Sequence, residues 1–214
     1  MHLTKNHCGE RNPPALREAG VGLVEILVTV LILAIGLLGI AGVQFMSKRA
    51  NFEAVQRTTA AHLANDILER MRSNPVTLYD YSVNAALLGN GSIATDLATT
   101  DVVMHDLWEW ERAIDGAAET TGANNTGGLV SPSACIYTTV PVAAVNKSGQ
   151  YMVTIVWRGT AKLSDPVNPA AVVPVPDPYD CGRALASGIY NSDDPAPVVD
   201  AHRRILVVDT YIAQ

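Results

Sequence analysis

The chain has 214 residues, a formal net charge of −6 and a pI near 5.3. That length accommodates one membrane-spanning helix and one domain of ordinary size. Contacts to nucleic-acid phosphates need clustered Lys and Arg, and the sequence has no basic stripe, so we expect no nucleic-acid partner.

Residues 1–20 are polar, contain Pro13-Pro14 and are typical of a leader peptide. Behind them an uncharged apolar run extends from Ile26 to Met46. Its 21 residues would form about 31 Å of helix, which matches a hydrocarbon core of about 30 Å. Glu25 lies at the edge of this run. Because an unpaired carboxylate is costly in lipid, Glu25 is the candidate functional residue of this segment.

Two ordinary interpretations of the apolar run compete. A secretory signal peptide would be cleaved behind the run, for example at Ala41-Gly42, although the apolar core of such a signal usually has only about 7–15 residues. A plain membrane anchor would leave the N-terminus in the cytoplasm by the positive-inside rule. Neither interpretation requires Gly20 or Glu25 at its position.

The stretch Gly20-Val21-Gly22-Leu23-Val24-Glu25, followed by a long apolar helix, resembles the class III signal of type IV pilins and of the pseudopilins of type II secretion. In that family a prepilin peptidase cuts after the glycine and methylates the new N-terminus. The resemblance implies cleavage between Gly20 and Val21, N-methylation of Val21, and Glu25 as the fifth mature residue. Family members more often have Phe and Thr where this chain has Val21 and Gly22.

The resemblance also implies a role for Glu25 and a set of partners. Its carboxylate would neutralise the N-terminal amine of a neighbouring subunit, an attraction that strengthens in a low dielectric. The implied partners are the prepilin peptidase and N-methyltransferase, other minor and major pilins, and the bacterial inner membrane. The domain would be periplasmic before assembly and would then lie in the pilus at the cell surface.

The helical pattern continues beyond Met46, with charged residues between apolar ones at three- and four-residue steps. The predicted apolar face consists of Phe52, Val55, Thr59, Leu63, Ile67 and Met71. Because proline disfavours helix in the residue before it, Asn74-Pro75 should end the helix at about Ser73. We therefore predict a membrane half at 21–46 and an amphipathic half that opens a domain at 47–214. A coiled-coil strand is the alternative for 47–73.

Three glycines, Gly36, Gly39 and Gly42, interrupt the apolar helix at three-residue steps. Each costs about 1 kcal/mol relative to alanine in a helix interior. They should therefore permit close packing between helices or local melting of this one.

After the long helix, residues 76–100 are expected to form a connecting region. Asp101 to Ala117 has the apolar spacing of a second helix, which Asp101 can cap. Trp108 and Trp110 within it are predicted core or interface anchors. Residues 118–133 should form an exposed loop because they are rich in Gly, Asn and Thr.

Three strands follow. Cys135–Val145 and Tyr151–Arg158 flank a turn at 146–149, and Arg204–Ile212 is rich in β-branched residues. The segment 165–179 contains five prolines, so it cannot be a central strand and should be a surface excursion.

The cysteines are Cys8, Cys135 and Cys181. If the segment that carries Cys8 is removed, the other two can pair. Their bond would close a loop worth about 4 kcal/mol and would indicate an oxidising compartment. Two free thiols in a cytosolic protein are the alternative.

The order of elements resembles the pilin plan, an α+β fold with a long N-terminal helix on a small antiparallel sheet and a disulfide-closed loop. It is most similar to minor pilins of the PilV type, which implies a role in pilus assembly and so in twitching motility or adhesion. A minor pseudopilin of type II secretion shares these motifs. A membrane-anchored periplasmic binding or adhesion domain that does not polymerise is the third possibility.

No pattern predicts catalysis, a cofactor or a metal site. His62, His105 and His202 lack the spacing of zinc ligands. Asp193, Asp194 and Asp200 match no defined calcium loop. Asn124-Asn125-Thr126 and Asn146-Lys147-Ser148 match the glycosylation pattern, which short sequences fulfil often by chance.

Overall fold

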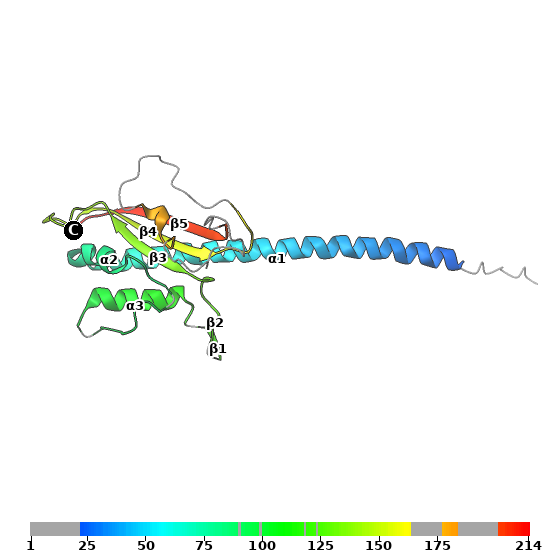
Figure 1. Ribbon diagram of the computed structural model, residues 1–214, viewed down its shortest axis with the longest axis horizontal. Coiled ribbons are helices and arrows are strands. Elements are labelled where there is room, and N and C mark those ends of the chain that lie inside the picture. The colour runs from blue at the N-terminus through cyan, green and yellow to red at the C-terminus, as the bar shows by residue number, and fades with distance from the viewer. Residues whose placement is uncertain are drawn as a thin grey trace, which may run out of the picture. The chain divides into compact units, whose positions relative to one another are not determined.

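The computed structural model describes residues 22–89, 91–98, 100–117, 119–122, 124–163, 177–183 and 201–214. The chain divides into two units, Met1–Ser47 and Lys48–Gln214. Helix α1, Leu23–Ser73, contributes to both (Figure 1). The long helix predicted from the sequence is therefore confirmed, and it ends at the residue that the Asn74-Pro75 pair predicts.

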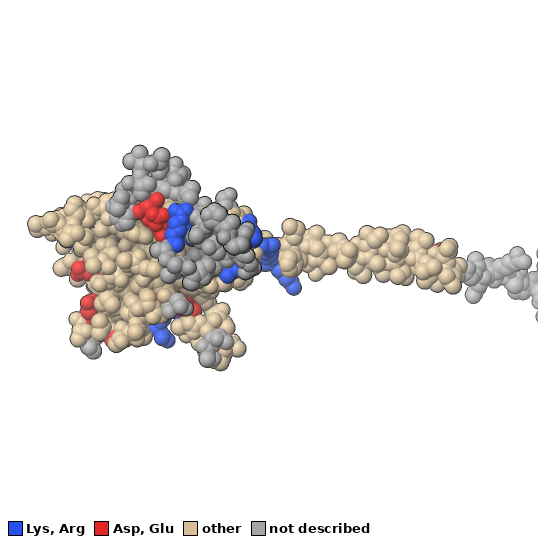
Figure 2. Space-filling model, in the orientation of Figure 1, with Lys and Arg blue, Asp and Glu red and all other residues tan. Residues whose placement is uncertain are grey.

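In the first unit, the described part of α1 is an exposed apolar helix. Every side chain from Gly22 to Ser47 is exposed, and Figure 2 shows this part of the helix as a surface almost without charge. Among the described residues, α1 is the one helix long and apolar enough to cross a membrane, with a mean hydropathy of 2.8 in its most apolar window.

The second unit is built around an antiparallel sheet in the order β3-β4-β5. Its strands are β3 (Ser133–Thr138), β4 (Gly149–Arg158) and β5 (Arg203–Ile212). The last two agree with the predicted strands within two residues. The first ends seven residues before the predicted Val145. Its backbone turns away where the Thr138 hydroxyl accepts a hydrogen bond from the Val140 N–H at 3.1 Å, and the next residue, Pro141, has no N–H to donate to a strand.

The main core lies between the inner face of this sheet and three helices. Strand β4 contributes Tyr151, Val153, Ile155 and Trp157 to it, because alternate residues of a strand point to the same face of a sheet. The helices are the second half of α1, α2 (Leu78–Asn84) and α3 (Val102–Ile114). Short α2 and the turn η1 (Pro75–Thr77) fall in a segment predicted to be a connection, so that prediction was wrong. Leu78 and Tyr81 of α2 are fully buried.

The buried face of α1 differs from the predicted one. The buried residues are Gln56, Ala60, Ala64, Ile67, Leu68 and Met71. Phe52 and Val55, which were predicted to be on this face, are 41% and 59% exposed. Alanines let the helix approach the rest of the domain closely. Gln56 is accommodated because its side chain donates to Gly128 O at 3.4 Å and accepts from Val130 N at 3.1 Å.

Helix α3 begins where the sequence predicts, but it ends at Ile114 rather than at the predicted Ala117. The Asp101 side chain caps it by accepting from the N–H groups of Val103 and Met104 at 2.9 and 3.1 Å. Within the predicted loop at 118–133, β1 (Thr120–Thr121) and β2 (Asn124–Asn125) form a small hairpin.

The outer face of the sheet carries a second, smaller core. Cys135, Val156 and Cys181 are buried there, and Tyr137 and Ile205 pack against them. Cys181 belongs to a turn at 177–183 that contains the short helix η2 (Pro178–Asp180), drawn in orange in Figure 1. The predicted excursion at 165–179 lies outside the described residues except for its last three.

Candidate functional site

The sequence places its main candidate site at the start of α1. Gly20 and Val21, the predicted processing site, lie outside the described residues. Glu25 lies in the first turn of α1 with an exposed side chain, and its N–H donates to Gly22 O at 2.9 Å. A carboxylate there interacts favourably with the helix dipole. Within this chain it remains accessible to another molecule.

The three glycines of α1 make no close contact within the described chain. A Cβ atom at Gly36, Gly39 or Gly42 would meet no other heavy atom within 4 Å. At 100° per residue, the three positions span about 120° of the helix surface. Packing within the described part of the chain therefore gives no reason for glycine at these positions.

The predicted disulfide between Cys135 and Cys181 is present, with a Cα–Cα distance of 5.9 Å and a sequence separation of 46 residues. It joins β3 to the turn at 177–183. Both cysteines are 1% exposed. The bond therefore fastens this turn to the outer face of the sheet.

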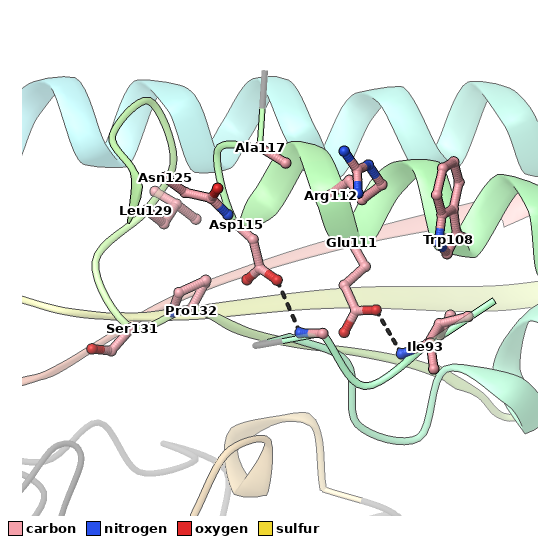
Figure 3. Close-up of a pocket in the computed structure, with 12 residues that line it drawn as sticks. Ile93, Trp108, Glu111, Arg112, Asp115, Ala117, Asn125, Leu129, Ser131 and Pro132 are labelled. Carbon is pink, nitrogen blue, oxygen red and sulfur yellow. Dashed lines mark hydrogen bonds between the residues drawn. The ribbon is translucent and has the colours of Figure 1, made fainter. Parts of the chain in front are cut away.

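A cavity of about 620 Å³ lies beside α3 (Figure 3). It is lined by residues from three stretches: 91–94, one side of α3 with the residues after it, and 125–132. Trp108 and Arg112 line this cavity and also a second one of about 350 Å³. The Arg112 guanidinium lies 4.9 Å from the centre of the Trp108 ring, a cation–π contact that fixes both side chains.

Glu111 at the base of the larger cavity is buried, with 2% exposure. One carboxylate oxygen accepts from Gly89 N at 2.8 Å and from the N–H and hydroxyl of Ser92 at 2.6 and 2.5 Å. The other accepts from Ile93 N at 2.7 Å, and Asp115 accepts from Gly91 N at 3.1 Å (Figure 3). These carboxylates therefore hold the loop that forms one wall of the cavity. This role of Glu111 could not be predicted from the sequence, because all but one of these donors are backbone N–H groups of residues 18 or more positions earlier in the chain.

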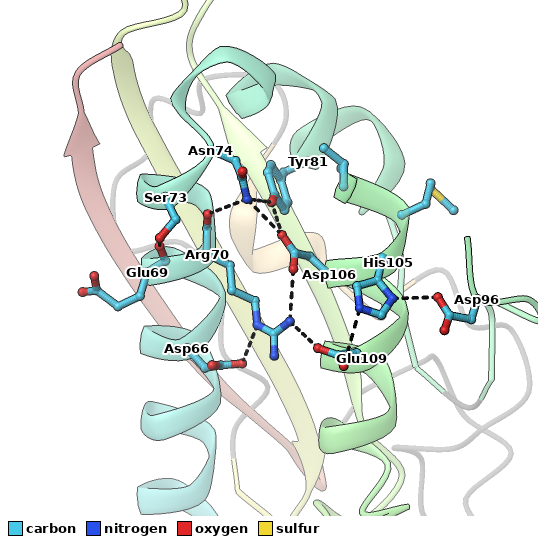
Figure 4. Close-up of polar contacts among 12 residues, drawn as sticks. Asp66, Glu69, Arg70, Ser73, Asn74, Tyr81, Asp96, His105, Asp106 and Glu109 are labelled. Atoms are coloured by element: carbon cyan, nitrogen blue, oxygen red, sulfur yellow. Dashed lines mark hydrogen bonds and ion pairs between the residues drawn. The ribbon is translucent and has the colours of Figure 1, made fainter. Parts of the chain in front are cut away.

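A charged network joins α1 to α3 at the other end of that helix (Figure 4). Arg70 of α1 contacts Asp66 at 3.2 Å, Asp106 at 3.1 Å and Glu109 at 2.7 Å. The Tyr81 hydroxyl donates to Asp106. Burial and that hydrogen bond raise the pKa of Tyr81. The phenol therefore stays protonated and serves as a donor rather than as a base.

His105 extends this network toward the loop before α3. Its Nδ1 lies 2.6 Å from Asp96, and its Nε2 lies 3.6 Å from Glu109 (Figure 4). The hydrogen bond to Asp96 raises the pKa of His105, and the neighbouring carboxylates of Glu109 and Asp106 act in the same direction. Trp108 stacks beside the ring, with centroids 6.4 Å apart.

The three histidines named above lie at separate places in the second unit. Among the described residues no group of three His, Cys, Asp or Glu side chains could hold a metal ion. His62 is exposed on α1, His105 lies on α3, and His202 precedes β5 with its Nδ1 3.2 Å from Gly159 O. Asp193, Asp194 and Asp200 lie outside the described residues.

Comparisons with known proteins find no relative of this chain. No family model matches it, and no match was found among curated proteins or solved structures.

Proposed function

We propose that this chain is a minor pilin, a structural subunit of a type IV pilus or of its tip or priming complex. The observation that carries this proposal is one continuous α1 that joins an uncharged exposed half to a half that carries the domain core, with Glu25 in its first turn. After removal of residues 1–20, the exposed half would hold the subunit in the inner membrane. The same half would later pack in the fibre.

The architecture of the second unit supports the proposal. A long helix on a three-stranded antiparallel sheet, with the Cys135–Cys181 disulfide, is the layout expected of a pilin. The disulfide is also consistent with a periplasmic domain, since such bonds persist in oxidising compartments. The proposed partners are the prepilin peptidase and other minor and major pilins.

In this proposal Glu25 neutralises the methylated N-terminal amine of a neighbouring subunit. Two unit charges 4 Å apart attract by about 1 kcal/mol in water and by about 4 kcal/mol at an effective dielectric constant near 20. A packed fibre excludes water, so the pair is worth most after assembly. A pairing of this kind also fixes the axial position of each subunit relative to the next.

The test uses Glu25→Gln in the natural host, which removes the charge and keeps the size of the side chain. We expect the variant to reach the membrane and to form its disulfide, but to be missing from fibres sheared off the cell surface. Glu69→Gln is the matched control, because Glu69 is an exposed acid of the same helix whose carboxylate contacts only Arg72 among the described residues. Incorporation of Glu25→Gln at the level of the control would reject the proposed role.

A further inference from the structure

The turn at 177–183 is held to the sheet by more than the disulfide. The Asp177 side chain accepts from Tyr179 N at 2.9 Å and so starts η2, and Pro178 behind it is buried. Cys181 follows at 1% exposure. This turn closes the outer core of the sheet, which is separate from the main core on the inner face.

Arg203, the first residue of β5, attaches the turn to the sheet by hydrogen bonds. It is 1% exposed, although it carries a full positive charge. Its Nη1 atom donates to the backbone carbonyls of Tyr179 at 2.8 Å and of Cys181 at 3.0 Å. The two acceptors stand on either side of residue 180, so one guanidinium fixes both the course of the turn and the position of Cys181.

The charge of the turn suits this contact. Burial raises the pKa of the Tyr137 phenol, on the same face of the sheet, to about 12. The carboxylates of Asp180 and Asp177 act in the same direction, and Arg203 acts in the opposite direction. Two carboxylates of the turn and the Arg203 guanidinium therefore act on the same phenol, and one of these carboxylates, Asp180, also pairs with Arg183 within the turn at 2.9 Å. None of these interactions depends on the bond between the two sulfurs.

We propose that Arg203 is a positioning residue for disulfide formation, which docks the turn at 177–183 on the sheet while Cys135 and Cys181 are still thiols. Two thiols joined only by a flexible loop meet at an effective concentration on the order of millimolar. Docking holds them within reach of each other and raises that concentration, because the entropy of closing the loop has already been lost.

The reaction that would report this docking is exchange with glutathione disulfide. The thiolate of one cysteine attacks it, forms a mixed disulfide and releases one glutathione thiolate. The thiolate of the second cysteine then attacks the mixed disulfide and releases the second glutathione. The two cysteines lose their protons to the buffer, and glutathione disulfide accepts the two electrons.

The experiment measures the effective concentration of the cysteine pair in the full chain in detergent, equilibrated with reduced and oxidised glutathione, with Cys8→Ala in every variant so that only Cys135 and Cys181 can react. In Arg203→Met, which keeps an unbranched stem but loses every donor, we expect this concentration to fall by roughly 10-fold or more, as the loss of charge-assisted hydrogen bonds requires. Arg203→Lys should recover part of the loss. An unchanged value in Arg203→Met, with the sheet intact by circular dichroism, would overturn the proposal.

Arg204→Met is the matched control. Arg204 is the next residue, but its side chain contacts Glu53, Ala161 and the carbonyl of Arg203 rather than the turn. In Arg204→Met we expect the effective concentration of the cysteine pair to stay within about 2-fold of the wild-type value. An equal fall in both arginine variants would show that general loosening of the sheet, rather than docking, sets the value.

A second measurement does not alter Arg203. In Cys135→Ala/Cys181→Ala protein, the amides of Asp180 and Arg183, which donate within the turn, should exchange with deuterium more slowly than in an unstructured peptide. Exchange at the unstructured rate, while the amides of β4 remain protected, would show that the turn is not docked without the disulfide. That result would contradict the proposal whatever the arginine variants do.

Discussion

The indole N–H of Trp110 in α3 donates to the backbone carbonyl of Leu63 in α1 at 2.8 Å. Trp110 is fully buried, so this bond fixes the depth at which α3 packs against the long helix. Trp110→Phe would remove the donor and leave a void beside the ring. We expect the free energy of unfolding in urea to fall by about 2–3 kcal/mol.

Trp108→Phe is the control for that prediction, because Trp108 lies two residues away on the same helix but is only half-buried. Phe keeps an aromatic face, so this substitution only weakens the cation–π contact with Arg112 and the stacking with His105, and we expect a loss of at most about 1 kcal/mol. Equal losses in the two variants would mean that the bond to Leu63 contributes nothing specific.

Glu111 stabilises the domain by accepting hydrogen bonds from Gly89, Ser92 and Ile93. In Glu111→Gln the amide group would direct a donor at another donor and would leave backbone groups without a partner. We expect a loss of about 2–4 kcal/mol in urea unfolding. Glu69→Gln, which breaks an exposed ion pair with Arg72, should change stability by no more than about 0.5 kcal/mol. A similar effect of the two substitutions would contradict the structural role of Glu111.

The contact between His105 and Asp96 predicts a pH dependence of stability. Because the folded pKa of His105 is raised above 6.5, its stabilising contribution is fully present below that unfolded value and is lost as the pH rises through the folded value. The difference in unfolding free energy between wild type and His105→Gln should therefore be larger at about pH 5.5 than at about pH 9. Asp96 remains ionised at the lower pH because the bond to His105 lowers its pKa.

His62→Gln provides the comparison for His105→Gln, since His62 is exposed on α1 and no described residue bonds to its ring. The pH dependence found for His105→Gln should exceed that of this variant. A pH-independent effect of His105→Gln, or an NMR titration of His105 below pH 6.5, would show that the Asp96 contact does not form in solution.

The sequence predicted those parts of the fold that follow from local pattern. The uncharged run and the helical pattern behind it predicted α1, the Asn74-Pro75 pair predicted its end, and Asp101 predicted the start of α3. Removal of Cys8 from the count left the two cysteines that do pair. Each of these signals lies in neighbouring residues or in composition, where physical rules act directly.

The sequence could not predict contacts between distant segments. Gln56 is buried, whereas Phe52 and Val55 are exposed, because Gly128 and Val130 satisfy its side-chain amide. These two partners lie more than 70 positions later in the chain, so no local pattern around Gln56 indicates them. Arg203 and Arg204 form a similar case. Strand alternation places their side chains on opposite faces of the sheet, but only the position of the 177–183 turn decides which of them is buried.

The central claim, that residues 1–20 are removed and that Glu25 then serves as the fifth residue of an assembly subunit, is tested most directly by the N-terminus of the protein purified from membranes of its natural host. Mass spectrometry of the intact chain and of its first peptide should find N-methylated Val21. A chain that begins at Met1, or near Val43 as a secretory signal peptide would leave it, would contradict the claim.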